Sequence, residues 1–446
     1  MDVTDSPSKL GMLDIKKLLI QYAVPSIIAM TAASLYNMVD SMFIGHGIGA
    51  EGLTGLSLTL PLMNISSAFG SLVGIGGATL MSVKLGQNDI DKARIILGNV
   101  VLMNIITGLL LSVVSLLFLD PILYLFGASA DTIGYARDYM RIILGGNVIT
   151  ASFLGLIEMS RSTGHPTRAM IAILIAVALN SLLDYIFIFL LDMGIKGAAM
   201  ATVAAQLASL CFVGSYFFSN KNFIRFERSI FRLNRSIVGG MLAIGLSPFL
   251  MNLCSSGVVA LINLSLKEHG GDAAIGAYGI VNRYVLLFVM INIGFNQGMQ
   301  PIAGYNFGAG KYDRLKKVLK YTIICAMSTS TIGFLLGELC PGAITSMFTT
   351  NTELTDIAER GLRLVLILFP FVGYQMVSAN FFQSIGMAKK AILLALSRQL
   401  LFLIPFLIIM PRIIGIDGVW LSIPMADCIA IILTSVMLWR ELKKLR

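Results

Sequence analysis

Two acidic side chains stand inside long apolar stretches of this sequence, where charge is costly. Asp40 falls in "SLYNMVDSMFIG" (34–45), and Asp184 closes the segment "NSLLD" (180–184). An ionised carboxylate at the centre of a membrane-spanning helix costs about 2.5–3.5 kcal/mol on insertion scales. Acids in such positions usually mark an ion or substrate pathway, so both are candidate functional groups.

Neutral polar residues accompany these acids at spacings of three or four, which bring side chains onto or beside one helical face. They are Tyr36 and Asn37 before Asp40, Asn180 before Asp184, and the pair Thr202 and Gln206 in a third apolar stretch. Two carboxylates close together in a low dielectric cannot both be ionised cheaply, so the pair is expected to bind a proton. A sodium ion is the alternative, held by oxygens of both acids, Asn180 and Thr202. The opposing interpretation is that each acid separately satisfies packed polar groups.

The apolar stretches that position these residues are long enough to cross a membrane. Of 446 residues, 56% are hydrophobic and 13% are charged, whereas soluble domains carry about 25% charged residues. A transmembrane helix needs about 20 mostly apolar residues. The sequence therefore predicts an all-α polytopic membrane protein with twelve spans, at 19–44, 53–79, 95–119, 139–158, 168–191, 197–218, 237–263, 274–302, 318–338, 361–383, 391–411 and 416–439.

Lys and Arg are divided unevenly between the two sides of these spans. One side, which includes both termini, has 24 of them and the other side has seven. Because cytoplasmic loops carry the excess, both termini are predicted to be cytoplasmic. The expected location is a prokaryotic plasma membrane. The net charge of +9 then faces membrane lipids, and no nucleic-acid partner is expected.

The second half of the chain repeats the first at a nearly constant offset, which indicates a duplicated unit. Pairs at an offset of 222 are Gly76 and Gly298, Arg141 and Arg363, and Ser162 and Ser384. Six helices per half is an even number, so both halves enter the membrane from the same side. We therefore expect two pseudo-symmetric six-helix bundles related by an axis along the membrane normal, as in secondary transporters. The expected division is an N-terminal lobe (1–218), a basic linker (219–236) and a C-terminal lobe (237–446).

The polar chemistry is not duplicated with the scaffold. Asp40 aligns with Asn263, and Asp184 aligns with Phe406. The cation site is therefore expected in the N-terminal lobe alone. Asp427 in the twelfth span is an additional candidate for a cavity-lining acid.

Other features bear on movement and on the linker. Pro25 and Pro248 lie inside the first helix of their halves, where each can kink the helix and act as a hinge or shape packing. The linker segment 220–235 alternates basic and apolar residues at spacings of three and four. That pattern predicts an amphipathic helix lying on the membrane surface.

Three segments of the chain resemble the multidrug and toxic compound extrusion (MATE) family. They are "YNMVDSMFIG" (36–45), "GNVITASFLGLIEMSRSTGHP" (146–166) and "QGMQPIAGYNFGAGKYDR" (297–314). The resemblance covers the whole chain and implies the MATE/MOP-type fold and export of drugs in exchange for protons or sodium ions. Within the family the chain is similar to the DinF-like branch. That similarity implies a cation site at Asp40, Asn180, Asp184 and Thr202, with Tyr36 and Tyr139 in support.

The expected function is secondary active efflux of amphipathic, often cationic small molecules by cation-coupled antiport. The protein is expected to act as a monomer without a cofactor and not as an enzyme, because no plausible nucleophile–base arrangement is visible. A flippase for lipid-linked oligosaccharides or lipids is the alternative. Such a protein would line its cavity with many basic residues, whereas Arg283 and Arg398 are the basic residues that fall well inside the predicted spans.

Overall fold

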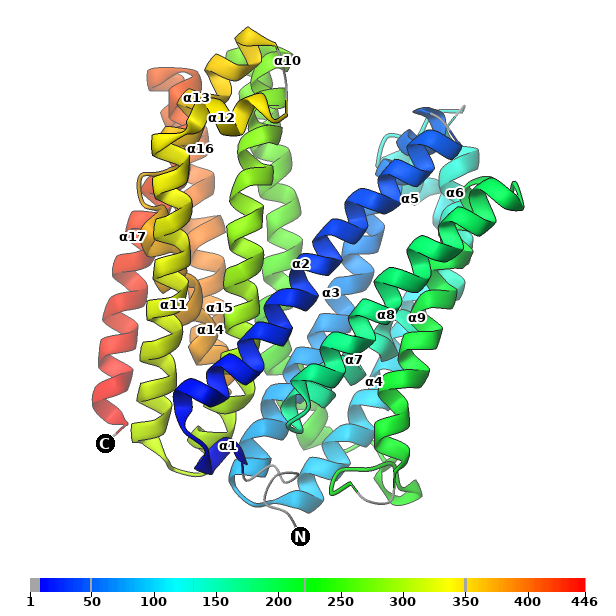
Figure 1. The fold of residues 1–446 in the computed structure, drawn as a ribbon, viewed down its shortest axis with the longest axis vertical. Helices are drawn as coiled ribbons and strands as arrows, with labels where there is room; N and C mark the ends of the chain where they lie inside the picture. The colour runs from blue at the N-terminus through cyan, green and yellow to red at the C-terminus, as the bar shows by residue number, and fades with distance from the viewer. Residues whose placement is uncertain (1–8, 49, 131, 220–221, 349–350, 446) are drawn as a thin grey trace. The chain divides into compact units, whose positions relative to one another are not determined.

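Nearly the whole chain is helical in the computed structural model (Figure 1). The structure describes residues 9–48, 50–130, 132–219, 222–348 and 351–445, with their side chains except those of 37, 38, 41, 42, 45, 46, 50, 51, 53 and 272. No β-strand occurs in this part of the chain. A helix pairs its backbone polar groups within itself, which is what a segment surrounded by lipid requires.

Ten helices of the described chain are long and apolar enough to cross a membrane, and two bent helix pairs bring the number to twelve if each pair is one span. The first half contains α1 (Lys9–Met12), α2 (Ile15–Gly47), α3 (Ala50–Gly86), α4 (Ile90–Leu117), α5 (Leu119–Leu125), α6 (Ile133–Gly145), α7 (Asn147–Ser162), α8 (Pro166–Asp184), the π-helix η2 (Tyr185–Leu190) and α9 (Gly194–Phe218). The second half contains α10 (Arg235–Gly308), α11 (Tyr312–Leu339), α12 (Pro341–Ser346), α13 (Thr352–Leu366), α14 (Phe369–Ser384), α15 (Ala388–Leu396), the π-helix η4 (Ser397–Leu403), α16 (Ile404–Ile414) and α17 (Ile416–Lys444). The predicted twelve-span all-α fold is confirmed.

The internal repeat is visible in the shapes of the helices. α6 and α7 form a pair bent by 54°, and α13 and α14 form a pair bent by 52° at the corresponding place. α10 consists of two spans, Arg235–Gly271 and Ala273–Gly308, because Gly271 has φ +68° and interrupts the helical backbone. This conformation favours glycine, which has no Cβ to clash.

The chain forms two compact units. The first comprises residues 1–13 and 28–249, and the second comprises residues 14–27 and 250–446. In the first unit α3 packs against α4, α6 and α7, and α8 packs against α9. Its core includes Ile44, Leu123 and Tyr139. The lobe boundaries expected from the sequence stay a prediction about which segments move together.

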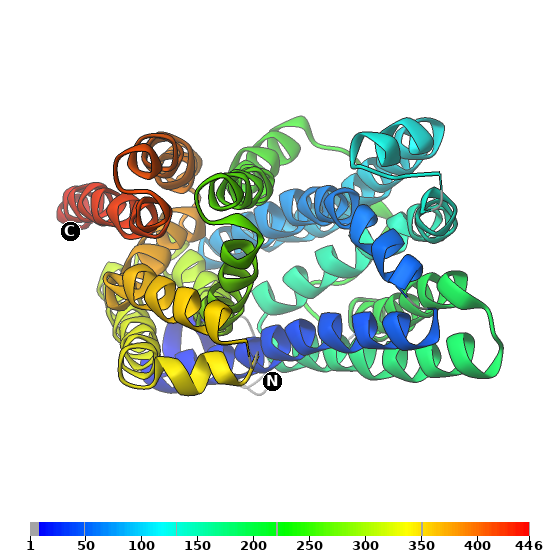
Figure 2. The same ribbon diagram turned by 90° about the horizontal axis from the view of Figure 1, so that it is seen from above.

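The second unit has its own hydrophobic core, which includes Leu266, Leu366 and Trp420. Here α11 packs against α14, and α17 packs against α13, α14 and α16. Figure 2 shows α16 and α17 side by side at the red end of the colour scale. Each unit therefore buries apolar surface of its own, as an independent domain does.

The first helix of each half is divided between the two units. The segment 14–27 of α2 belongs to the second unit, where the backbone of Ala23 lies against Gly298 and that of Ile27 lies against Gly294. A Cβ on either glycine would come within 2.7 Å of the α2 backbone. Small residues allow membrane helices to approach this closely, and the approach increases van der Waals contact.

α10 shows the matching arrangement in the first unit. Its segment 235–249 packs on α3, where Gly76 faces the carbonyl of Met241 and Gly245 faces the carbonyl of Leu72. Added Cβ atoms would lie 2.0 and 1.8 Å from those oxygens. Both halves therefore use glycines to anchor the beginning of one long helix.

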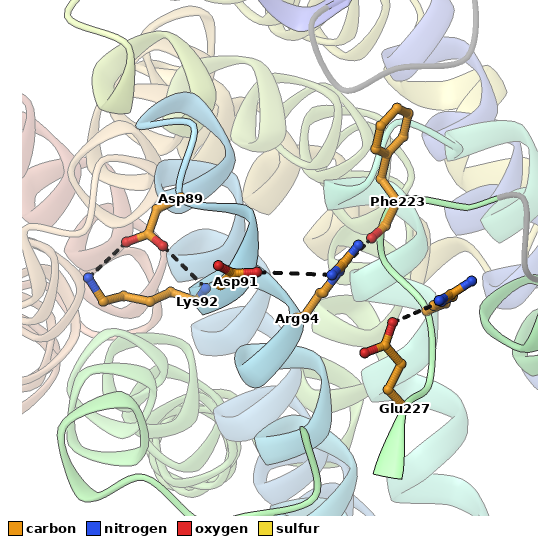
Figure 3. A network of polar contacts seen from close by, with 7 residues as sticks. Asp89, Asp91, Lys92, Arg94, Phe223 and Glu227 are labelled. Carbon is orange, nitrogen blue, oxygen red and sulfur yellow. Dashed lines mark hydrogen bonds and ion pairs between the residues drawn. The ribbon is translucent and has the colours of Figure 1, made fainter. Parts of the chain in front are cut away.

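The linker is not an amphipathic helix, so that expectation is wrong for its described part. Residues 222–234 run irregularly, with a single 3₁₀ turn η3 (Arg228–Ile230). Its backbone is tied to α4 instead: Arg94 Nε donates to the Phe223 carbonyl at 2.9 Å (Figure 3). Asn99 donates to the Arg232 carbonyl at 3.1 Å and accepts from the Asn234 amide at 2.9 Å.

These contacts explain why the linker is not helical although its residues repeat at helical spacing. Each hydrogen bond from α4 uses a backbone group of the linker, and the carbonyl of Ile230 lies where a Cβ on Gly98 would stand. Arg225 Nε also donates to Glu227 Oε1 at 2.9 Å and lowers the pKa of that carboxyl. Tertiary bonds to backbone groups have replaced those of a surface helix.

Candidate functional site

Helices of the first unit bring the predicted polar residues together. α2 supplies Tyr36 and Asp40, α8 supplies Asn180 and Asp184, and α9 supplies Thr202. The carboxyl groups of Asp40 and Asp184 are close enough to interact with each other. Asp40 is 8% exposed and Asp184 is 0% exposed, so the two acids face one another inside the bundle.

Thr202 joins the side chains around this pair. Its Oγ1 lies 3.4 Å from the Tyr36 hydroxyl and donates to the Ala198 carbonyl at 3.1 Å. Tyr139 from α6, which is 1% exposed, lies near Thr202 and the two acids. Tyrosines from two different helices therefore border the acid pair.

The amide of Asn180 links the acids to this hydroxyl group. When the amide is oriented to match its neighbours, its nitrogen donates to Asp184 Oδ2 at 2.8 Å and to the Tyr36 hydroxyl at 3.3 Å. Its oxygen then accepts from the backbone N–H of Thr202 at 3.0 Å and lies 3.3 Å from Thr202 Oγ1. An ionised carboxylate only accepts, so this orientation of the amide is the one that satisfies an ionised Asp184.

One oxygen of each acid is left without a donor. Asp40 Oδ1 and Asp184 Oδ1 are buried, and neither accepts a hydrogen bond from the described chain. A buried carboxylate oxygen without a partner carries a large desolvation cost. A proton shared between the two carboxyls, or a cation beside them, would relieve that cost. The hydroxyl and amide oxygens around the acids are also ligands that suit a hard cation such as sodium.

The outer members of the predicted set have other surroundings. Gln206, one turn from Thr202, accepts a hydrogen bond at 2.5 Å from Thr150 of α7, a partner that spacing along one helix did not indicate. The side chain of Asn37 lies outside the described residues. A π-helix, η2, begins directly after Asp184, and π turns within α-helices are frequent at functional sites.

The corresponding place in the second unit is apolar. Phe402, Phe406 and Ile423 align with Asn180, Asp184 and Thr202. All three pack against the hydrophobic core of that unit. The acid pair therefore belongs to one half of the duplicated scaffold, as expected from the sequence.

Fold and site together define a helical membrane protein of two homologous halves with one buried pair of acids. The chain belongs to the MatE family, whose model matches residues 25–186 and 248–409. The two matched segments begin at Pro25 and Pro248, the prolines paired by the internal repeat. The MATE family expected from the sequence is thus confirmed.

Curated relatives cover nearly the whole chain. The chain is 28% identical over 419 residues to "Multidrug export protein MepA" of Staphylococcus aureus (strain MSSA476), covering 92% of this chain and 90% of the relative. It is 27% identical over 425 residues to the protein of the same name from Staphylococcus haemolyticus (strain JCSC1435), covering 95% and 93%.

Solved structures show the same fold. The chain is similar to the MATE multidrug transporter DinF-BH in complex with rhodamine 6G, at 36% identity, with a TM-score of 0.88 and 95% of each chain covered. It also matches a structure of MATE in the bent conformation at 23% identity, with a TM-score of 0.93 and 98% of each chain covered. The second likeness concerns the fold alone.

Proposed function

We propose that this protein exports amphipathic, often cationic compounds in exchange for protons or sodium ions that bind at Asp40 and Asp184. The observation that carries the proposal is that two buried acids lie close together and that one oxygen of each has no hydrogen-bond donor in the described chain. Two relatives, a multidrug export protein and a multidrug transporter in complex with rhodamine 6G, support the substrate class.

The exchange follows from charge. With a cation bound, the acid pair is close to neutral and can sit in a low dielectric at small cost. Without it, the pair is negative and attracts a positively charged substrate. Substrate and coupling ion therefore compete for one negative charge, which makes the exchange an antiport.

Either ion is compatible with the residues around the acids. A shared proton would be held between the two carboxyls, with an Asn180 N–H donated to Asp184. A sodium ion would instead use the oxygen of the Asn180 amide as a ligand, together with the acids and Thr202.

Alternating access also needs a place where the chain can bend. Pro25 lies near the point where α2 passes from the second unit to the first, between residues 27 and 28. Pro248 lies beside the corresponding point in α10, between residues 249 and 250. A proline inside a helix removes one backbone hydrogen bond and favours bending there. We include both prolines in the proposal as hinges.

Further parts of the proposal concern the setting of the protein. It lies in a prokaryotic plasma membrane with both termini in the cytoplasm and works as a monomer, with lobes divided at the linker 219–236. The excess of Lys and Arg on the side of the termini supports this orientation.

Transport by purified protein in proteoliposomes tests the proposal. Rhodamine 6G should move uphill under an imposed proton or sodium gradient, and Asp40→Asn and Asp184→Asn should abolish uphill movement. Asp120→Asn is the matched control, because Asp120 is an exposed acid paired with Arg137 at 2.7 Å. If either buried variant still drove export at the wild-type rate, that acid would not belong to the coupling site.

A further inference from the structure

A second charged pair lies within the membrane-spanning part of the chain, in the other unit. Arg398 Nε donates to Asp427 Oδ1 at 2.6 Å. Arg398 lies about 15 Å along the helix from Ala388, at 1.5 Å per residue, which is near the middle of a hydrocarbon core about 30 Å thick. Charged side chains at this depth face the interior of a bundle or a water-filled cavity rather than lipid.

The two partners are not equally buried. The side chain of Asp427 is 6% exposed and that of Arg398 is 24% exposed. Asp427 is the only hydrogen-bond partner of Arg398 within the described chain, and it engages Nε. The two Nη groups make no hydrogen bond there, and the side chain that carries them is partly exposed. A guanidinium carries five N–H donors in a planar fork that matches a carboxylate.

The position of this pair in the internal repeat relates it to the acid site of the first unit. Asp427 aligns with Gln206, which lies one turn from Thr202 in the first unit. Arg398 lies one turn before Phe402, the counterpart of Asn180. The pair therefore stands one helical turn from the apolar counterpart of the acid site. The second unit lacks the acids of the first and carries an arginine with open donors near the corresponding positions of its own helices.

The local backbone supports a functional role. Arg398 belongs to the π-helix η4 (Ser397–Leu403), just as Asp184 directly precedes the π-helix η2. The next residue, Gln399, donates to Ser255 of α10 at 2.9 Å, and its Oε1 is buried without a partner in the described chain. Wide helical turns of this kind are rare and are frequently found at functional sites.

We propose that Arg398 binds the carboxylate of zwitterionic amphipathic substrates through its open Nη groups, while Asp427 holds the guanidinium in position through Nε. The proposal rests on the proposed export function and adds a substrate class to it. A substrate that carries a carboxylate besides its positive group would gain a charge-assisted hydrogen bond that a purely cationic substrate lacks. Asp427 neutralises Arg398 when no carboxylate is bound, so the site has little net charge in the absence of substrate.

Two dyes that differ only at the carboxyl group test this assignment. Rhodamine 6G is an ethyl ester and a cation, and rhodamine 19 is the corresponding free acid and a zwitterion. Binding of each dye to purified full-length protein is measured by fluorescence anisotropy. For the double variant Arg398→Gln/Asp427→Asn, we expect the Kd for rhodamine 19 to rise about tenfold or more, since a hydrogen-bonded charge is lost. The Kd for rhodamine 6G should change less than about threefold.

Further variants separate recognition from stability. Arg398→Lys keeps the charge but lacks the planar fork, so it should weaken rhodamine 19 selectively even if the double variant fails to fold. Arg360→Gln/Asp417→Asn is the control, because it removes another Arg–Asp pair of the same unit whose arginine is 68% exposed. It should leave both dyes unaffected.

The assignment is overturned if wild type does not bind rhodamine 19, or if Arg398→Lys affects both dyes equally or neither. Those binding outcomes do not depend on gradient-driven export. Failure of wild type to export rhodamine 6G under any gradient would instead refute the proposed function, so the two failures are distinguishable.

Discussion

Asp40 on α2 and Asp184 on α8 are buried close enough to each other to interact, although the two helices are far apart in sequence. Two ionised carboxylates repel each other and cannot hydrogen-bond, because neither has a hydrogen to donate. The proposed function therefore places a proton or another cation between them. The predictions that follow concern this pair, the helices that carry it and the linker that joins the halves.

Asn180 should be essential for holding the pair in place. Replacing it by leucine keeps the branched shape but removes the N–H that reaches Asp184 Oδ2 at 2.8 Å. A hydrogen bond to a charged group contributes about 1.5–3 kcal/mol, so gradient-driven transport should fall about tenfold or more. Ser181→Ala is the control, since Ser181 bonds only to its own helix at the Val177 carbonyl, and it should transport normally.

The glycine contacts of α10 should matter for stability, and the helix provides its own comparison. A Cβ on Gly298 would stand 2.7 Å from the backbone of Ala23. Gly298→Ala should therefore destabilise the protein by about 1–3 kcal/mol through overpacking. A Cβ on Gly279 would meet nothing within 4 Å, so Gly279→Ala should be neutral or slightly stabilising. Thermal unfolding followed by size-exclusion chromatography measures both, and equal Tm values would contradict the contact.

The sequence predicted the helices well because every segment that crosses lipid must be mostly apolar and must pair its backbone polar groups within itself. Each predicted span coincides with an observed helix or bent pair apart from a few terminal residues. Most of the observed helices are longer than the apolar stretch from which the span was predicted. The acid cluster was also predictable, since Asp40 and Asp184 have few alternatives inside a bilayer. The orientation of the Asn180 amide could not be predicted from the sequence, because it depends on side chains from three helices.

The linker shows where sequence periodicity fails. Its basic and apolar residues repeat at helical spacing, yet the repeat does not reveal that Asn99 on α4 will bind two of its backbone groups. Nor does it reveal that Ile230 fits against Gly98. The ion pair between Arg398 and Asp427 was not predicted for a similar reason. The two residues are on different helices, and no spacing in the sequence indicates that they are in contact.

Asn99 should hold the linker against α4. Asn99→Leu removes the bonds to the Arg232 carbonyl and the Asn234 amide, so amides of residues 222–234 should exchange with solvent about tenfold faster or more. Hydrogen exchange detected by mass spectrometry measures the change. Unchanged exchange in this variant would show that Asn99 does not restrain the linker.

Glu227→Gln provides the control for the linker. The hydrogen bond from Arg225 lowers the pKa of Glu227, so the pair stabilises the folded state above the unfolded pKa of about 4.3 and loses this effect as the pH falls through the lower folded value. The glutamine variant removes the charge at neutral pH. Because exposed ion pairs contribute little, exchange of the linker amides should stay at the wild-type rate.

The prolines at the unit boundaries should affect movement more than binding. Pro25→Ala and Pro248→Ala restore a backbone donor where α2 and α10 pass between units, so each should slow transport several-fold with little change in rhodamine 6G affinity. Pro61→Ala is the matched control, since Pro61 lies inside α3, which belongs entirely to the first unit. Equal effects of all three substitutions on transport would assign the prolines to packing.

Proton release on substrate binding tests the shared acid pair most directly. Rhodamine 6G is added to purified protein in weakly buffered solution with a pH indicator, with and without sodium. If the acids bind the coupling proton together, wild type should release protons as the dye binds, while Asp40→Asn and Asp184→Asn should release none. If sodium occupies the site instead, adding sodium should suppress the wild-type release. Undiminished proton release from both variants would contradict the account.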